Sequence, residues 1–250
     1  MEFYERAREI WLDLLKLPTD LRRDLTALFR IEFLPSSDWV SPEAFARYGV
    51  PSVIPLITTA AFVQLDVRDG VVDAIGQIGE PAGPALMSVL EQPLFGAYWA
   101  AWRRAGMADT GAVSEGMSGA RYTYARALEG LHAVARQAPG APPWFPAAQR
   151  VAFAYRELPG LEYSDLRGPA HVVVEDVRVG TSLATGTWEG MGREVPAPPG
   201  TDIRNTGLWR SLEQRQRHLQ EESARAAEEA RLAEFAGFYL ADQQRRKSGW

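Results

Sequence analysis

The chain of 250 residues contains no cysteine. Disulfide bonds, thiolate nucleophiles and zinc sites built on cysteine are therefore excluded, and the composition fits a reducing compartment. The sequence also lacks an uninterrupted apolar run of about 18 residues, the length that a membrane-spanning helix needs. Its first residues show neither the basic start nor the apolar core of a signal peptide. We therefore expect a cytoplasmic protein without a membrane span.

Motifs of nucleotide binding and catalysis are missing as well. The sequence has no P-loop, no Rossmann glycine fingerprint and no G-x-S-x-G nucleophile motif. Its three histidines, His132, His171 and His218, are not spaced as paired metal ligands. The net charge of −5 argues against a dedicated nucleic-acid binder. We predict no metal, no cofactor and no catalytic residue.

Helical periodicity is present from the first residues onward. Apolar residues recur at helical spacing over residues 3–15, and the pattern ends before a proline. A second apolar stripe, over residues 21–29, follows a helix-capping residue, either Thr19 or Asp20. These patterns predict an N-terminal helical hairpin within residues 1–40.

An internal repeat lies in the middle of the chain. A shift of 30 residues places Ala44-Phe45 on Ala74-Ile75, Tyr48-Gly49 on Ile78-Gly79, and Leu56 on Leu86. A shift of 53 residues places a second set, Arg68, Ala74, Ile75 and Ile78, on Arg121, Ala127, Leu128 and Leu131. Because a single helical hairpin cannot bury its apolar face, repeats of this kind are stable only when neighbours stack.

The longer second interval is predicted to hold additional elements. We expect one more helix over residues 94–102 and a glycine-rich loop over residues 108–119. Helices over residues 119–137 and 144–157 are predicted to follow, separated by Gly140-Ala141-Pro142-Pro143.

The segment from Asp66 to Glu91 resembles the HEAT repeats of the phycobilisome-lyase type. The matching runs are Asp66-Val67-Arg68, Ala74-Ile75-Gly76-Gln77-Ile78-Gly79 and Ala82-Gly83-Pro84-Ala85-Leu86. The resemblance implies a short HEAT-like α-solenoid over residues 41–158. Lyase relatives bind bilins, but no residue of this sequence specifically indicates a chromophore. Iron-binding hydroxylases with HEAT-like folds use His-Glu pairs, which this sequence lacks.

Residues 159–206 form a predicted irregular arm. The β-branched runs at residues 171–174 and 177–179, with turn residues Gly180 and Gly186, predict a small β-hairpin. A stretch of this length without a helix signal is unusual in a compact domain and suggests a binding arm or a surface wrap.

Residues 207–250 predict one long C-terminal helix. A helix-packing seam recurs every seven residues and comprises Leu212, Leu219, Ala226, Ala233 and Leu240. Such a seam is typical of a coiled coil or of packing along another helix. The alternative is a solvated helix that packs on its own domain. An apolar end that needs cover comprises Phe235, Phe238, Tyr239 and Leu240.

These patterns predict a mainly α protein. Our first hypothesis is a noncatalytic protein–protein interaction or scaffold protein, which binds a protein partner or a second copy through the repeat surface and the terminal helix. One alternative is a ligand-binding or lyase-like enzyme with a site near Trp102, Tyr122 and Arg126. Another is a nucleic-acid-binding protein of HEAT-like fold. The candidate binding residues are aromatic and basic: Trp99, Trp102, Arg103, Arg104, Arg121, Tyr122 and Arg126.

Overall fold

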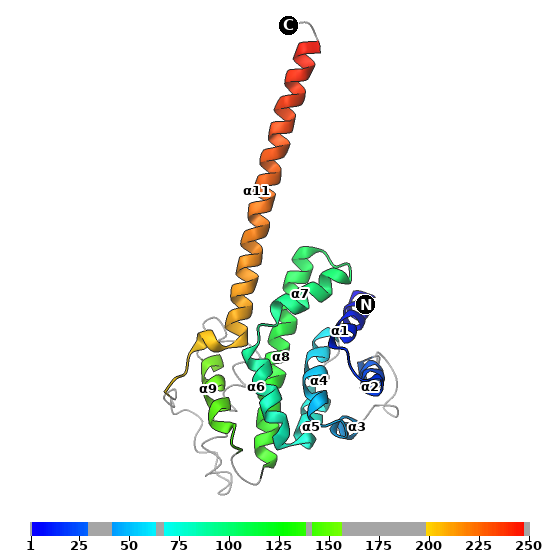
Figure 1. Ribbon diagram of the computed structural model, residues 1–250, viewed down its shortest axis with the longest axis vertical. Helices are drawn as coiled ribbons and strands as arrows, with labels where there is room; N and C mark the ends of the chain where they lie inside the picture. The colour runs from blue at the N-terminus through cyan, green and yellow to red at the C-terminus, as the bar shows by residue number, and fades with distance from the viewer. Residues whose placement is uncertain (1, 30–41, 64–67, 139–141, 157–198, 248–250) are drawn as a thin grey trace. The chain divides into compact units, whose positions relative to one another are not determined.

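The computed structural model confirms that the protein is mainly α-helical (Figure 1). It contains two units, Met1–Leu212 and Glu213–Trp250. No β-strand occurs in the part of the chain that the structure describes, which comprises residues 2–29, 42–63, 68–138, 142–156 and 199–247.

The helices follow the order predicted by the periodicity. The first unit contains α1 (Glu2–Leu15), α2 (Thr19–Phe29), α3 (Pro42–Ala46), α4 (Val53–Thr59), α5 (Arg68–Ile78), α6 (Gly83–Glu91), α7 (Phe95–Arg104), α8 (Asp109–Gln137) and α9 (Phe145–Arg156). The last helix, α11 (Gly207–Lys247), begins in the first unit and makes up the described part of the second. Short 3₁₀ turns occur at Val50–Ser52, Ala60–Phe62, Glu80–Ala82 and Ile203–Asn205.

Two successive pairs of helices, α3–α4 and α5–α6, are joined by the same turn. Gly49 has φ 61° and ψ −150°, and Gly79, thirty positions later, has φ 76° and ψ −155°. Each glycine is followed by a 3₁₀ turn with a proline, Pro51 or Pro81, at its start. This positive φ is cheap only for glycine, so the repeated glycine has a direct physical cause. The internal 30-residue correspondence therefore extends to the backbone.

Equivalent helices of the two pairs pack on one another: α3 contacts α5, and α4 contacts α6. Residues paired by the 30-residue shift are buried in both copies, as Phe45 and Ile75 are in the first helices and Leu56 and Leu86 in the second. These contacts bury apolar side chains of both pairs of helices.

Helix α8 is the central helix of this unit and packs against α5, α6 and α7 (Figure 1). The predicted glycine-rich loop over residues 108–119 is wrong, because α8 begins at Asp109. Its glycines serve packing instead of chain reversal. A Cβ atom at Gly116 would lie 3.0 Å from the backbone nitrogen of Trp99, so glycine at this position allows α7 to approach closely.

An aromatic cluster joins α1 to this stack. The ring of Trp11 on α1 stacks on Tyr98 of α7 with centroids 4.8 Å apart, and Phe62 lies 5.1 Å from Tyr98. The indole nitrogen of Trp11 donates a hydrogen bond to the Thr58 hydroxyl at 3.1 Å, and the Tyr98 hydroxyl donates to the Thr58 carbonyl at 3.0 Å. The N-terminal helix is therefore part of the core of the first unit.

Asp24 ties α2 to the turn that follows α3. Its carboxylate accepts hydrogen bonds from Arg47 at 2.6 Å, from the Tyr48 hydroxyl at 2.7 Å and from Arg23 at 3.1 Å. Burial raises the pKa of Asp24, but the hydrogen bonds from Tyr48 and Arg23 and the charges of both arginines outweigh burial and lower it. The ionised carboxylate is therefore the form that the fold stabilises.

Helix α9 packs on α6 and α8, near the end of the chain's helical stack. The Trp144 indole lies against Gly83 and donates a hydrogen bond to the Glu80 carbonyl at 3.1 Å. The predicted β-hairpin at residues 171–179 lies outside the described residues.

Candidate functional site

The predicted aromatic and basic residues lie on α7 and α8, but they do not form one surface. Trp102 is fully buried in the core, with its ring 4.7 Å from that of Tyr4 and 5.3 Å from that of Phe62. Arg104 and Arg121 are exposed. Because Trp102 contributes no exposed area, it shares no accessible surface with the other candidates.

Trp99 and Arg103 converge on Asp109, a residue that the sequence did not single out. The Trp99 indole nitrogen donates to Asp109 Oδ1 at 3.0 Å, and Arg103 Nε lies 3.1 Å from the same oxygen. Arg103 also donates to the Met107 carbonyl at 3.0 Å. These contacts clamp the turn between α7 and α8, so both side chains have a structural task that accounts for their position.

Tyr122 and Arg126 lie together on α8. The Arg126 guanidinium carbon is 4.9 Å from the centre of the Tyr122 ring, and its Nη1 atom is 3.0 Å from a carboxylate oxygen of Glu129. Arg126 is 6% exposed and Glu129 is 9% exposed, so the pair is almost removed from water. A buried pair of this kind is costly to break, because one charge would remain without its counter-charge.

His132 follows Glu129 by three residues, about one turn further along α8. Burial, together with the positive charge of Arg136, lowers the pKa of His132 to about 4. The imidazole is therefore neutral at physiological pH, which suits a packed side chain better than a general acid or base operating near neutrality.

The beginning of α11 is fixed in the first unit by a buried hydrogen-bond network. The Ser211 hydroxyl accepts the Leu94 backbone N–H at 2.9 Å and lies 2.8 Å from the Tyr124 hydroxyl. Tyr124 in turn donates to the Gln92 carbonyl at 2.7 Å and accepts a longer bond, 3.1 Å, from Leu94. Burial raises the pKa of Tyr124 well above its ordinary value, so the phenol stays protonated.

Gly207, the first residue of α11, makes this contact possible. A Cβ atom there would lie 2.2 Å from the Gln92 carbonyl oxygen, which is a backbone atom and cannot turn aside. Nothing in the sequence marked Ser211 or Gly207 as special, because their roles depend on a partner more than a hundred residues away. A glycine at a helix start also has a local explanation, as a helix-capping residue.

The described part of the second unit is a single helix with no core of its own. Three large apolar residues, Leu232, Phe235 and Phe238, are spaced three apart and are 57%, 71% and 69% exposed. We call these three residues the aromatic stripe. Residues three apart in sequence lie near one another on a helix surface, so the stripe is a continuous apolar strip.

The predicted seam occupies a different side of α11. Leu219 is 42% exposed, Ala226 and Ala233 are exposed, and Leu212 is half-buried within the first unit. The side chain of Leu240 lies outside the described residues. Phe235 follows Ala226 by nine residues, which is two and a half turns of an α-helix, so the two lie on opposite sides. The helix therefore carries two separate apolar faces.

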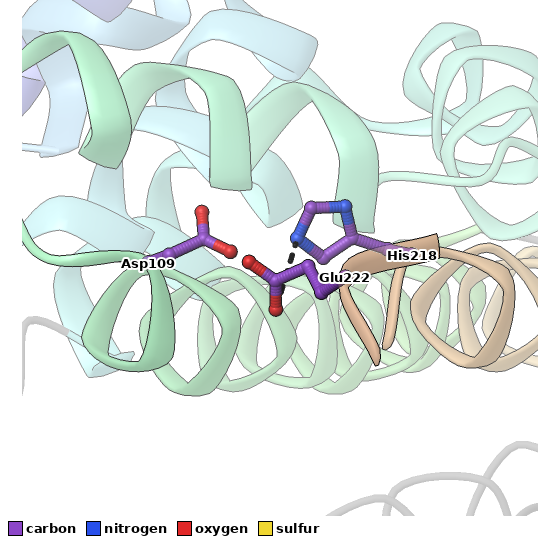
Figure 2. Close-up of side chains that lie close together, drawn as sticks. All are labelled: Asp109, His218 and Glu222. Atoms are coloured by element: carbon purple, nitrogen blue, oxygen red, sulfur yellow. Dashed lines mark ion pairs between the residues drawn. The ribbon is translucent and has the colours of Figure 1, made fainter. Parts of the chain in front are cut away.

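Figure 2 shows His218 and Glu222 on α11, together with Asp109 from the first unit. His218 and Glu222 are four residues apart, and His218 Nε2 lies 3.9 Å from a Glu222 carboxylate oxygen. This i, i+4 contact is an ion pair only when the imidazole is protonated. Within either unit taken by itself, the described residues bring no three histidine or acidic side chains to metal-ligand distance.

Comparison with known proteins gives no match: no family model, no curated protein and no solved structure resembles the chain significantly. Among the described helices, none combines the length and the apolar character that crossing a membrane requires.

Proposed function

We propose that the protein is a noncatalytic interaction or scaffold protein and that α11 binds a protein partner. The aromatic stripe carries this proposal. A helix gains most of its stability from packing an apolar face, and in the described part of the second unit Leu232, Phe235 and Phe238 face solvent instead. Exposed contiguous apolar surface marks protein-binding sites.

The helical stack of the first unit is consistent with a scaffold. We infer that α3–α6 are two units of a HEAT-like α-solenoid, supported by the matching turns at Gly49 and Gly79 and by the pairing of α3 with α5. In such folds each unit contacts only its neighbours, which leaves an extended surface for partners. The ligand-binding alternative has less support, because Trp102 lies inside the core.

Quantitative affinity capture with three baits tests the proposal. The baits are the full chain, the stripe variant F235Q/F238Q and the control R217Q/E213Q. Glutamine is a good helix former, so both variants keep the helix, and the control leaves the net charge unchanged. We expect at least one protein, or the chain itself, to be captured by the wild type and the control and lost by the stripe variant. Identical capture by all three baits would refute a binding role for the stripe.

A further inference from the structure

We propose that a second copy of this chain covers the aromatic stripe, with the two α11 helices antiparallel. This inference rests on the proposed function, because it names the partner of the same surface. The argument has three parts: the apolar area that the stripe offers, the distribution of charge along α11, and the alignment that satisfies both.

The area of the stripe suits a pair of helices. A phenylalanine offers roughly 150–250 Å² of surface. Phe235 and Phe238 are about 70% exposed, so four such rings in a dimer supply on the order of 500 Å². A specific interface buries about 1,000 Å² or more in total. The stripe therefore provides about half of a stable interface, and the turns that flank it must provide the rest.

The charge of α11 favours its own copy as the source of those flanking contacts. Residues 213–250 contain seven basic and seven acidic residues, so the segment is neutral and neither repels a copy of itself nor selects an oppositely charged partner. The charges are nevertheless unevenly placed. Between positions 221 and 234 there are five acidic and two basic residues, whereas positions 245–247 are all basic.

This asymmetry distinguishes the two possible directions. A parallel pair would place the acidic stretch of one helix beside the acidic stretch of the other, where like charges are destabilising. An antiparallel pair places the basic last turn of each helix beside the acidic stretch of its partner. A segment that is neutral overall but has an acidic stretch and a basic end is thus the pattern expected of an antiparallel, self-complementary interface.

One alignment joins the apolar and charged contacts. If Leu232 faces Phe235 of the second copy, Phe235 faces Leu232 of that copy by symmetry. Counting outward along both helices, Glu221 then faces Arg246 of the second copy, and both positions lie on the side of α11 that carries Phe235. The contact covers residues 221–246 of each chain, a length of about 39 Å at 1.5 Å per residue. This overlap supplies the flanking area that the stripe alone lacks.

The mass of the full chain in solution is the first test. Sedimentation velocity over a concentration series is expected to show a concentration-dependent species of twice the 27.7 kDa chain mass. The stripe variant F235Q/F238Q is expected to weaken dimerisation about 100-fold or more. The control R215Q/E213Q, on the same helix but outside the overlap, is expected to dimerise like the wild type. Circular dichroism confirms that each variant retains its helix content.

Charge reversal tests the partner and the direction together. E221R and R246E are each expected to weaken the dimer at least tenfold at low salt. Their combination in one chain is expected to restore wild-type dimerisation, since each reversed pair meets its reversed counterpart in the second copy. In a parallel pair like charges meet in the wild type, in each single reversal and in the combination alike, so the single reversals would not weaken the dimer. Unchanged dimerisation of the single reversals, or failure of the combination to restore the dimer, overturns the antiparallel arrangement.

Other outcomes overturn the inference outright. A wild-type chain that stays monomeric up to about 100 μM, or a stripe variant that dimerises unchanged, excludes a second copy as the occupant of the stripe. The proposed function is judged separately, because stripe-dependent capture of a different protein would keep it while removing self-association.

Discussion

The buried network at the start of α11 gives the sharpest prediction about stability, through the substitution Tyr124→Phe. The change removes one hydroxyl and keeps the ring, which is 0% exposed and lies 5.6 Å from the ring of Tyr155. The Gln92 carbonyl loses its donor at 2.7 Å and the Ser211 hydroxyl loses its neighbour at 2.8 Å. Leu94 keeps one acceptor, Ser211, at 2.9 Å.

The expected cost follows from these losses. A buried polar group left without a partner costs about 1–3 kcal/mol, whereas an ordinary hydrogen bond contributes about 1 kcal/mol net. One orphaned acceptor and one weakened hydroxyl contact therefore predict a loss of about 2 kcal/mol in the free energy of unfolding. Ser211→Ala is expected to cost a similar amount, because the Leu94 and Phe95 N–H groups both point at its oxygen.

A double-mutant cycle measured by urea unfolding of the full chain tests this reasoning. The two substitutions share the Tyr124–Ser211 contact, so together they should cost less than the sum of their separate effects by about 1 kcal/mol. Ser114→Ala, at an exposed position of α8, is the control and should change the free energy of unfolding by less than about 0.5 kcal/mol. A cost below about 0.5 kcal/mol for Tyr124→Phe, or strict additivity in the cycle, would refute the network.

Three further predictions concern the first unit. In a thermal unfolding assay, Gly83→Ala should destabilise the protein by about 1–3 kcal/mol, since its Cβ would lie 2.1 Å from the Trp144 indole. Gly70→Ala is the control: its Cβ would meet no atom within 4 Å, so stability should stay unchanged or rise slightly. The low pKa of His132, about 4 against an ordinary value near 6.5, means that the unfolded chain binds more protons between these values. Stability should therefore fall as the pH drops from 6.5 to 4, and His132→Gln should flatten this dependence; equal pH profiles would contradict the assignment. Because the pKa of Asp24 is lowered in the folded protein, its carboxylate stabilises the fold at pH values above the ordinary pKa of an aspartate. This contribution is lost as the pH falls below about 4, so Asp24→Asn should remove that acid-sensitive component from the unfolding profile.

Much of the fold was predictable from local signals. Periodicity located the helices, and the 30-residue correspondence identified a turn whose glycine conformation recurs at Gly49 and Gly79. The glycines of α8 were wrongly interpreted as a loop, because packing between helices explains them and a turn does not. Gly111, Gly116 and Gly119 lie inside α8, and Gly116 is there because α7 passes within contact distance. A sequence pattern shows a glycine but does not show which backbone lies beside it.

For the candidate binding residues too, the sequence showed the residue types but not which side chains are buried. Aromatic and basic side chains between Trp99 and Arg126 were identified by type, yet burial separates them: Trp102 is in the core, and Trp99 serves the turn at Asp109. The network around Ser211 depends on contacts across 117 positions and has no local signature. On α11, by contrast, the exposure of Phe235 and Phe238 agrees with the expectation that this apolar end needs cover.

The contact between the start of α11 and the α6–α7 junction is a noncovalent, reversible link between distant segments of a chain that has no cysteine. Leu94 and Ser211 are joined over a separation of 117 residues, and Gly207 brings the backbone so close to Gln92 that no side chain could stand between them. Closing so long a loop is what a disulfide does in secreted proteins, where it limits the freedom of the unfolded chain. Here the closure is made of hydrogen bonds, so it leaves that freedom intact and can open without any change in redox conditions.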